Sequence, residues 1–249
     1  MRIAEASTPT LMTLWGDTEP AIHKAPFLED AAQILLTALY NHFEDSVVLA
    51  RIFLTVPFLS LPPSNEAFVR QMAESAGVAS ELKATTPVLS LLGTRGRERD
   101  WNDRRNSKGH IGIPLVSSAF VDSIPMISRV LKELGVPMHW VDSQDSQVVL
   151  EAMGRAASLF FVEDAANAVD HQGRKIIVAQ DFVSKYDVVG VFGTGSVYPN
   201  GQILVLIVFC KEAVPRKVAE QFLALVEMFK QRTKTLAAST RIFAEGFLR

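Results

Sequence analysis

The sequence lacks the residues that build covalent or metal-held frameworks. It has 249 residues and a single cysteine, Cys210, so it forms neither an intramolecular disulfide nor a four-cysteine zinc site. Its five histidines show none of the short spacings, such as His-Glu-x-x-His, that metal sites use. We therefore expect no preformed metal site, and we leave the cofactor unknown. A lone histidine that binds haem, at His110 or His139, is the alternative to a structural histidine.

An excess of positive charge and a long apolar run are also missing. The chain has 25 Lys and Arg residues against 27 Asp and Glu, a formal net charge of −2, which argues against nucleic-acid binding. The longest apolar run, residues 203–210, has eight residues, far fewer than a membrane helix needs. The first 25 residues contain no apolar core of a secretory signal. The expected protein is soluble and cytoplasmic, with no membrane association.

Catalytic motifs are absent as well. The Gly-x-Gly of residues 190–198 fails as a dinucleotide fingerprint, because Tyr198 stands where the third glycine is required and a strand, not a helix, follows. The Gly-x-Ser-x-Gly pattern fails around Ser196. These glycines are typical of a bulge or a close backbone approach, with a ligand pocket as the alternative. The sequence therefore favours a protein that is not an enzyme.

What is present is a mixture of helical and strand-like periodicity over most of the chain. Asn200-Gly201 lies between two apolar runs and predicts an antiparallel hairpin. We expect an α+β fold, with a central antiparallel sheet of about six strands flanked by helices and with long helices at both ends of the chain. Residues 1–25 are expected to be a flexible segment, and residues 26–249 a single domain. Helices are predicted over residues 26–43, 66–76, 124–134, 144–155, 177–186 and 215–233, and strands over residues 47–56, 87–92, 110–116, 136–141, 158–163, 188–198 and 202–210.

The second half of the chain resembles a known family. A glycine-rich strand, the turn Tyr198-Pro199-Asn200-Gly201, an apolar strand and Pro215-Arg216 at the start of a long helix are similar to the closing segment of a GAF domain. Trp101-Asn102-Asp103-Arg104-Arg105, then Gly109-His110 and Ile113-Pro114-Leu115, are also similar to the divergent GAF-like sensor modules of bacterial signalling proteins. The resemblance covers residues 26–234.

This resemblance implies a GAF/PAS-like sheet with a pocket on one face and terminal helices that pair in a homodimer. The resemblance does not imply a ligand, because GAF domains bind cyclic nucleotides, haem, bilins, small metabolites or nothing. Our first hypothesis is a non-catalytic, small-molecule-sensing regulatory domain of bacterial signal transduction, as in two-component systems. A histidine kinase or another signalling protein is then the expected partner.

The charged stretch 94–110 supplies the candidate binding residues, because binding residues concentrate on loops. It has six basic and three acidic side chains. Guanidinium groups bind anions and an indole offers a flat apolar wall, so the ligand is expected to be a small anionic or aromatic molecule. The alternative is a solvated loop whose charges pair with each other and whose tryptophan anchors it. The expected pocket lies under residues 101–110 and the helices before Gly135. Its candidate ligand-binding residues are Trp101, Asn102, Arg104, Arg105 and His110.

The homodimer is also expected from the helix over residues 215–233, whose apolar face includes Phe222 and Phe229 and is too broad for one sheet to cover. The helices that begin near Pro26 and Pro215 should lie side by side and form the contact. Two other functions stay open. One is an enzyme, a hydrolase or reductase that uses Arg105, His110 and a carboxylate. The other is a ligand-free dimerisation or interaction module.

Overall fold

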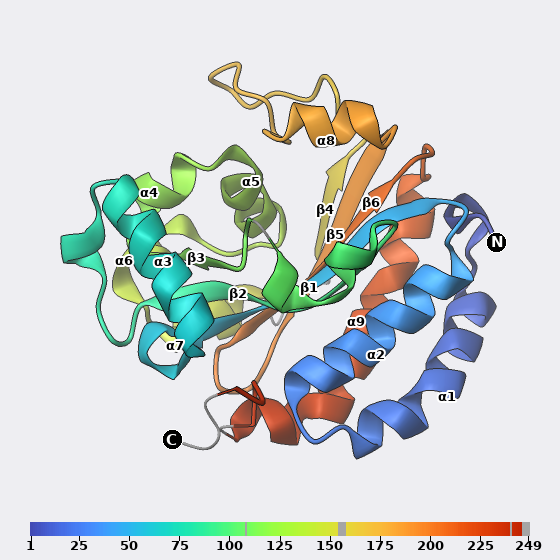
Figure 1. Ribbon diagram of the computed structural model, residues 1–249, viewed down its shortest axis with the longest axis horizontal. Coiled ribbons are helices and arrows are strands. Elements are labelled where there is room, and N and C mark those ends of the chain that lie inside the picture. The colour runs from blue at the N-terminus through green and yellow to red at the C-terminus, as the bar shows by residue number, and fades with distance from the viewer. Residues whose placement is uncertain (108, 154–157, 240, 246–249) are drawn as a thin grey trace.

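One antiparallel sheet organises the protein. The computed structural model describes residues 1–107, 109–153, 158–239 and 241–245 (Figure 1). Within them, six strands pair in the order β3-β2-β1-β6-β5-β4, and every pairing is antiparallel. The predicted α+β class is therefore confirmed. The strands are β1 Val47–Pro57, β2 Pro87–Gly96, β3 Gly112–Pro114, β4 Ser158–Val162, β5 Gly190–Val197 and β6 Ile203–Cys210.

Helices cover both faces of this sheet. The long helices α2 and α9 pack on one face and α1 packs against both of them, whereas α4 to α8 belong to the core on the opposite face (Figure 1). The helices are α1 Thr8–Lys24, α2 Leu28–His42, α3 Pro63–Ser75, α4 Ser118–Asp122, α5 Pro125–Glu133, α6 Met138–Ser143, α7 Ser146–Met153, α8 Gln180–Lys185 and α9 Arg216–Ala238.

The alternation of side chains along each strand divides the interior into two cores. On β1, Ala50, Ile52 and Leu54 face the long helices, and Leu49 and Phe53 face the other side, as a period of two requires. The β5–β6 hairpin forms as predicted. Gly201 in its turn has a φ of +83°, a conformation that glycine adopts without steric cost.

The flexible segment expected over residues 1–25 is instead largely helical. Ser7 caps α1 by accepting a hydrogen bond from the backbone N–H of Thr10 at 3.3 Å. Leu11, Leu14 and Ile22 then fall on one face and are buried against α2 and α9. The mixed composition of the segment conceals this face, because polar residues fill the exposed positions between the apolar ones.

Helix α1 also changes the argument for the dimer. Helices α2 and α9 do lie side by side, as predicted. However, Phe222, Leu225 and Phe229 are fully buried within the chain, in the core that α1 completes. The prediction of an exposed apolar face over residues 215–233 is therefore wrong, because the sheet and α1 together cover this face.

Residues 136–141, predicted as a short strand, contribute instead to helix α6. Pro137 precedes the helix and fixes a backbone angle compatible with its start. Trp140 and Val141 are both buried, and a run this short is too brief for its period to separate a helix from a strand. Of the predicted helix over residues 144–155, α7 forms the central part, and Arg155 lies outside the described residues.

Candidate functional site: a cavity with an arginine in its floor

A cavity of about 630 Å³ lies on the sheet face opposite α2 and α9. This volume is within the range of roughly 300–1,000 Å³ that is typical of small-molecule sites. Strands β1 and β6 provide its floor, α5 and α8 provide walls, and residues of the segment 98–110 cover it. The position agrees with the pocket expected under residues 101–110 and the helix before Gly135. The contribution of α8 was not foreseen.

The floor is apolar apart from one residue. Because side chains alternate along a strand, β1 presents Leu49, Arg51 and Phe53 to the cavity, and β6 presents Val205, Ile207 and Phe209. Arg51 pairs with Thr94 of β2 on one side and Ile207 of β6 on the other. It therefore lies on one of the two central strands of the sheet, with a position fixed by hydrogen-bonded neighbours on both sides.

The charge of Arg51 lacks a compensating carboxylate among the described residues. No acidic oxygen lies within ion-pair distance of its guanidinium. Its Nη2 donates a hydrogen bond to Ser107 Oγ at 3.3 Å, and its buried Nε has no partner. Burial lowers the pKa of Arg51 from its usual value to about 10. At neutral pH this side chain is consequently a desolvated cation in an apolar floor.

His110 lies in the cover of the cavity, near this cation. His110 is exposed as a whole residue, but desolvation of the imidazole at the cavity and the charge of Arg51 lower its pKa below the usual value, so at pH 7 most of it is neutral, with one nitrogen donating and the other accepting. Its φ is +58°, which is uncommon for a residue other than glycine. Ser107 Oγ donates to the carbonyl oxygen of Gly109 at 2.7 Å. Ser107 therefore links the floor arginine to the backbone beside His110.

One wall of the cavity is aromatic. The ring centroids of Trp101 and Tyr186 are 4.8 Å apart, those of Trp101 and Phe182 are 5.7 Å apart, and both pairs meet edge to face. Phe182 in turn contacts Phe209 of the floor at 5.4 Å. Such arrangements are favoured by the ring quadrupoles. The predicted site residue Trp101 is thus anchored by packing and also lines the cavity.

The lining also includes side chains of both charges. Glu98 and Asp100 come from the cover and Lys185 from α8. Lys185 Nζ lies 4.9 Å from the ring centroid of Tyr186, and the Tyr186 hydroxyl together with Glu98 raises the pKa of this lysine. Lys185 is exposed to solvent, whereas Arg51 is half-buried in the floor.

Three of the five predicted site residues lie outside the lining. Asn102 Oδ1 accepts a hydrogen bond from the backbone N–H of Gly96 at 2.9 Å and so fastens the loop to the end of β2. Arg105 is exposed and forms an ion pair with Asp103 at 2.7 Å. For Arg105 the alternative of a solvated, self-paired loop is the better description. Lys108 of the same stretch lies outside the described residues.

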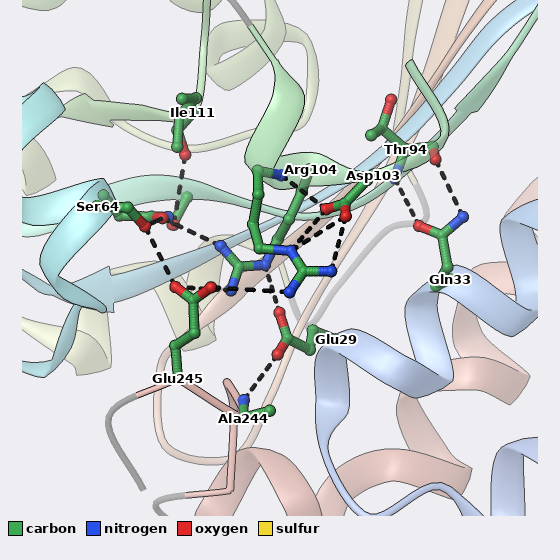
Figure 2. Close-up of polar contacts among 12 residues, drawn as sticks. Glu29, Gln33, Ser64, Thr94, Asp103, Arg104, Ile111, Ala244 and Glu245 are labelled. Atoms are coloured by element: carbon green, nitrogen blue, oxygen red, sulfur yellow. Dashed lines mark hydrogen bonds and ion pairs between the residues drawn. The ribbon is translucent and has the colours of Figure 1, made fainter. Parts of the chain in front are cut away.

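Arg104 has a structural position that the sequence did not indicate. It is buried, forms an ion pair with Glu29 at the start of α2, and donates through Nη1 to Asn65 Oδ1 of α3 at 3.1 Å (Figure 2). Its guanidinium lies 4.7 Å from the ring centroid of Phe243. The backbone N–H of Ala244 donates to the same Glu29 at 2.7 Å. Arg104 therefore joins the cover of the cavity to α2, α3 and the C-terminal segment 243–245.

The other candidate groups lie away from the cavity. His139, on α6, is exposed and outside the lining. In the described part of the chain, no three His, Cys, Asp or Glu side chains are placed to hold a metal ion. Cys210 is buried on the face covered by α2 and α9, and burial raises the pKa of its thiol. Among the same residues, no helix has the length and hydropathy to span a membrane.

The sequence analysis missed Arg51, although a signal was present. Residues 47–56 read as a strand that is almost wholly apolar and covered on both faces, and Arg51 is the one charged residue in that run. Charged side chains are rarely buried without a partner. An arginine in the middle of a predicted central strand therefore indicates a functional position.

Neither a protein-family model nor a curated protein matches the sequence. Among solved structures, the chain is similar to the phycocyanobilin-bound GAF domain from a cyanobacterial phytochrome, with 10% identity and a TM-score of 0.48, over 92% of this chain and 96% of that one. It is also similar to the GAF domain of a phosphoenolpyruvate-protein phosphotransferase from Acinetobacter, with 10% identity and a TM-score of 0.44, over 92% and 95%.

Likenesses this weak carry no argument about a ligand. The features implied by the sequence resemblance are nevertheless present in the chain itself, namely a six-stranded antiparallel sheet, a cavity on one face and long helices towards both ends. The fold observed in the chain is therefore the arrangement that the sequence resemblance to GAF domains implies.

Proposed function

We propose that this protein is a small-molecule-sensing regulatory domain that binds its ligand in the cavity and does not catalyse a reaction. The observation that carries the proposal is the cavity itself, about 630 Å³ of space with an apolar floor, an aromatic wall and few polar groups. Sites of this composition bury most of a small ligand and use their few polar groups to orient it. The ligand expected from this lining is a small anionic or aromatic molecule.

The alternatives fit the geometry less well. A ligand-free interaction module would need no cavity, and the side chains on this face of the sheet would fill the space. The enzyme considered from the sequence combines Arg105, His110 and a carboxylate. Arg105 lies outside the lining and is paired with Asp103, so that combination does not assemble in the cavity.

The experiment is a ligand screen against a variant whose cavity is filled. Ile127 of α5 is buried and lines the cavity, so Ile127→Trp places an indole in the space. Leu59 is 75% exposed and lies outside the lining, so Leu59→Trp is the matched control. A ligand at a hundredfold excess over Kd stabilises a fold by about 2.7 kcal/mol, which thermal-shift measurements detect.

We expect ligands that raise the Tm of the wild type and of Leu59→Trp but not that of Ile127→Trp. Native mass spectrometry of the purified protein adds the mass of any ligand that copurifies. Ligands that stabilise Ile127→Trp as strongly as the wild type would place the binding site elsewhere and contradict the proposal.

The output of such a sensor is part of the same proposal. The family resemblance implies a homodimer and a signalling partner such as a histidine kinase. Because the apolar faces of α2 and α9 are used within the chain, a dimer contact would use the outer surfaces of the terminal helices. Sedimentation velocity at micromolar concentration should show a dimer, and a monomer would remove this part of the proposal.

A further inference from the structure

We propose that the ligand is a singly charged carboxylate with an aromatic body, whose carboxylate pairs with Arg51 and whose ring packs against the wall formed by Trp101, Phe182 and Tyr186. This inference rests on the proposed binding function and specifies the chemical class of the ligand.

The charge of the ligand follows from the charges of the lining. Arg51 is the cation in the floor with no carboxylate partner among the described residues, whereas Lys185 is exposed at the α8 wall and lies over the ring of Tyr186. A single negative charge therefore compensates Arg51. A dianion, such as a phosphate monoester, would leave one negative charge uncompensated over the apolar floor, with the exposed carboxylates of Glu98 and Asp100 in the same lining. A buried charge without a partner is strongly unfavourable.

A carboxylate fits the donors that remain free. A guanidinium has five N–H donors in a planar fork that matches a carboxylate. At Arg51, Nη2 donates to Ser107, and Nη1 has no hydrogen-bond partner among the described residues. Since Nε is buried, the carboxylate would approach the terminal nitrogens. The neutral imidazole of His110, also in the lining, can donate one further hydrogen bond.

The body of the ligand follows from the wall opposite this polar end. Trp101 meets Tyr186 and Phe182 edge to face, Phe182 and Tyr186 pack in a tilted arrangement with centroids 5.5 Å apart, and all three line the cavity. Aromatic rings gain from edge-to-face and offset contacts beyond the burial of their area. An aromatic ring can extend this cluster, and the aliphatic side chains of α5 and the floor can enclose its remaining edge.

The test uses isothermal titration calorimetry with three probes that each contain an aromatic ring. Indole-3-acetate has a single negative charge, indole-3-acetamide is its neutral counterpart, and phenyl phosphate is largely a dianion at neutral pH. Hexanoate serves as a carboxylate without a ring. The proteins are the wild type, Arg51→Met and Arg105→Met. The last removes an arginine that is exposed and outside the cavity.

We expect the wild type and Arg105→Met to bind indole-3-acetate at least tenfold more tightly than indole-3-acetamide, hexanoate or phenyl phosphate. In Arg51→Met the preference for the acid over the amide should disappear. Binding of the amide to Arg51→Met with wild-type affinity shows that the variant cavity is intact.

The inference would be overturned by equal affinity of the wild type for acid and amide, by an acid preference that survives Arg51→Met, or by no binding of any aromatic probe. Tighter binding of phenyl phosphate or hexanoate than of indole-3-acetate would also overturn it. The proposed function is tested separately. If the probes bind the wild type without acid preference and Ile127→Trp blocks them, the binding site is correct and the assigned ligand class is wrong.

Discussion

Replacing Arg51 with methionine should make the unliganded protein more stable. The pKa of Arg51 is lowered from the usual arginine value to about 10, and burial is the cause. One pKa unit corresponds to about 1.36 kcal/mol, so burial disfavours the charged form by about 3 kcal/mol. Both the folded and the unfolded chain hold the proton at pH 7, and the full cost is therefore present there. It would diminish only as the pH rises above about 10, where the folded chain begins to lose this proton.

The substitution also removes one favourable contact. The hydrogen bond from Arg51 to Ser107 contributes about 1 kcal/mol net, and methionine retains most of the aliphatic packing. The free energy of unfolding should therefore rise by about 2 kcal/mol. In a chain of this size, 1 kcal/mol shifts Tm by about 2–4 °C, so Tm should rise by about 4–8 °C.

Urea unfolding followed by circular dichroism measures this change, with the m-value as a check that the unfolding transition is unaltered. Arg105→Met is the control, because its exposed ion pair with Asp103 should contribute less than about 1 kcal/mol. If Arg51→Met lowers the free energy of unfolding by more than about 1 kcal/mol, Arg51 is compensated within the fold. The argument for an anion at this position would then fail.

Three further predictions concern His110 in the cover of the cavity, the ion pair between Glu29 and Arg104, and Phe229 of α9. Affinity for an aromatic carboxylate should increase as pH falls from about 8 to about 5.5, because desolvation and Arg51 lower the pKa of His110 in the free protein and a bound anion raises that pKa again. Glu98 and Asp100 also line this cavity. Calorimetry should therefore compare the wild type with His110→Phe, for which affinity should not change over this pH range. Glu29→Gln removes the nearer ion-pair partner of buried Arg104 and leaves the longer pair with Glu245 at 3.9 Å, so it should cost about 1–3 kcal/mol of stability. Urea unfolding measures this cost. Hydrogen exchange at residues 243–245 should become faster, and unchanged exchange would show that Glu29 does not hold this segment. Phe229→Glu buries a charge in the core and should unfold the protein, which circular dichroism measures. A well-folded variant that sediments as a smaller species than the wild type would instead support the dimer interface predicted from the sequence.

Local sequence patterns determined most of the elements of this fold. The run at residues 47–56 and the two runs around Asn200-Gly201 became β1, β5 and β6, because β-branched apolar residues and a turn dipeptide specify strands through short-range sterics. The long helices α2 and α9 followed from apolar residues at spacings of three and four. The alternation of side chains also determined which residues of β1 share a face, once β1 was recognised as a strand.

Tertiary contacts decided the rest. Trp101 and His110 line the cavity whereas Arg104 and Arg105 do not, yet all four belong to one polar stretch with no period that separates them. Their directions are fixed by partners distant in sequence, such as Glu29 for Arg104 and Tyr186 for Trp101. The same holds for α1, because its apolar face is buried only where α2 and α9 provide the surface that it covers.

Arg51 combines both kinds of information. Its place in the strand, and therefore the face on which it lies, follows from the sequence alone through the period of two. Whether its charge is compensated depends on which acidic side chains the folded chain brings within a few ångströms, and this is a property of long-range packing. Among the described residues none comes within ion-pair distance, so the tertiary structure makes a strand arginine the polar centre of a cavity.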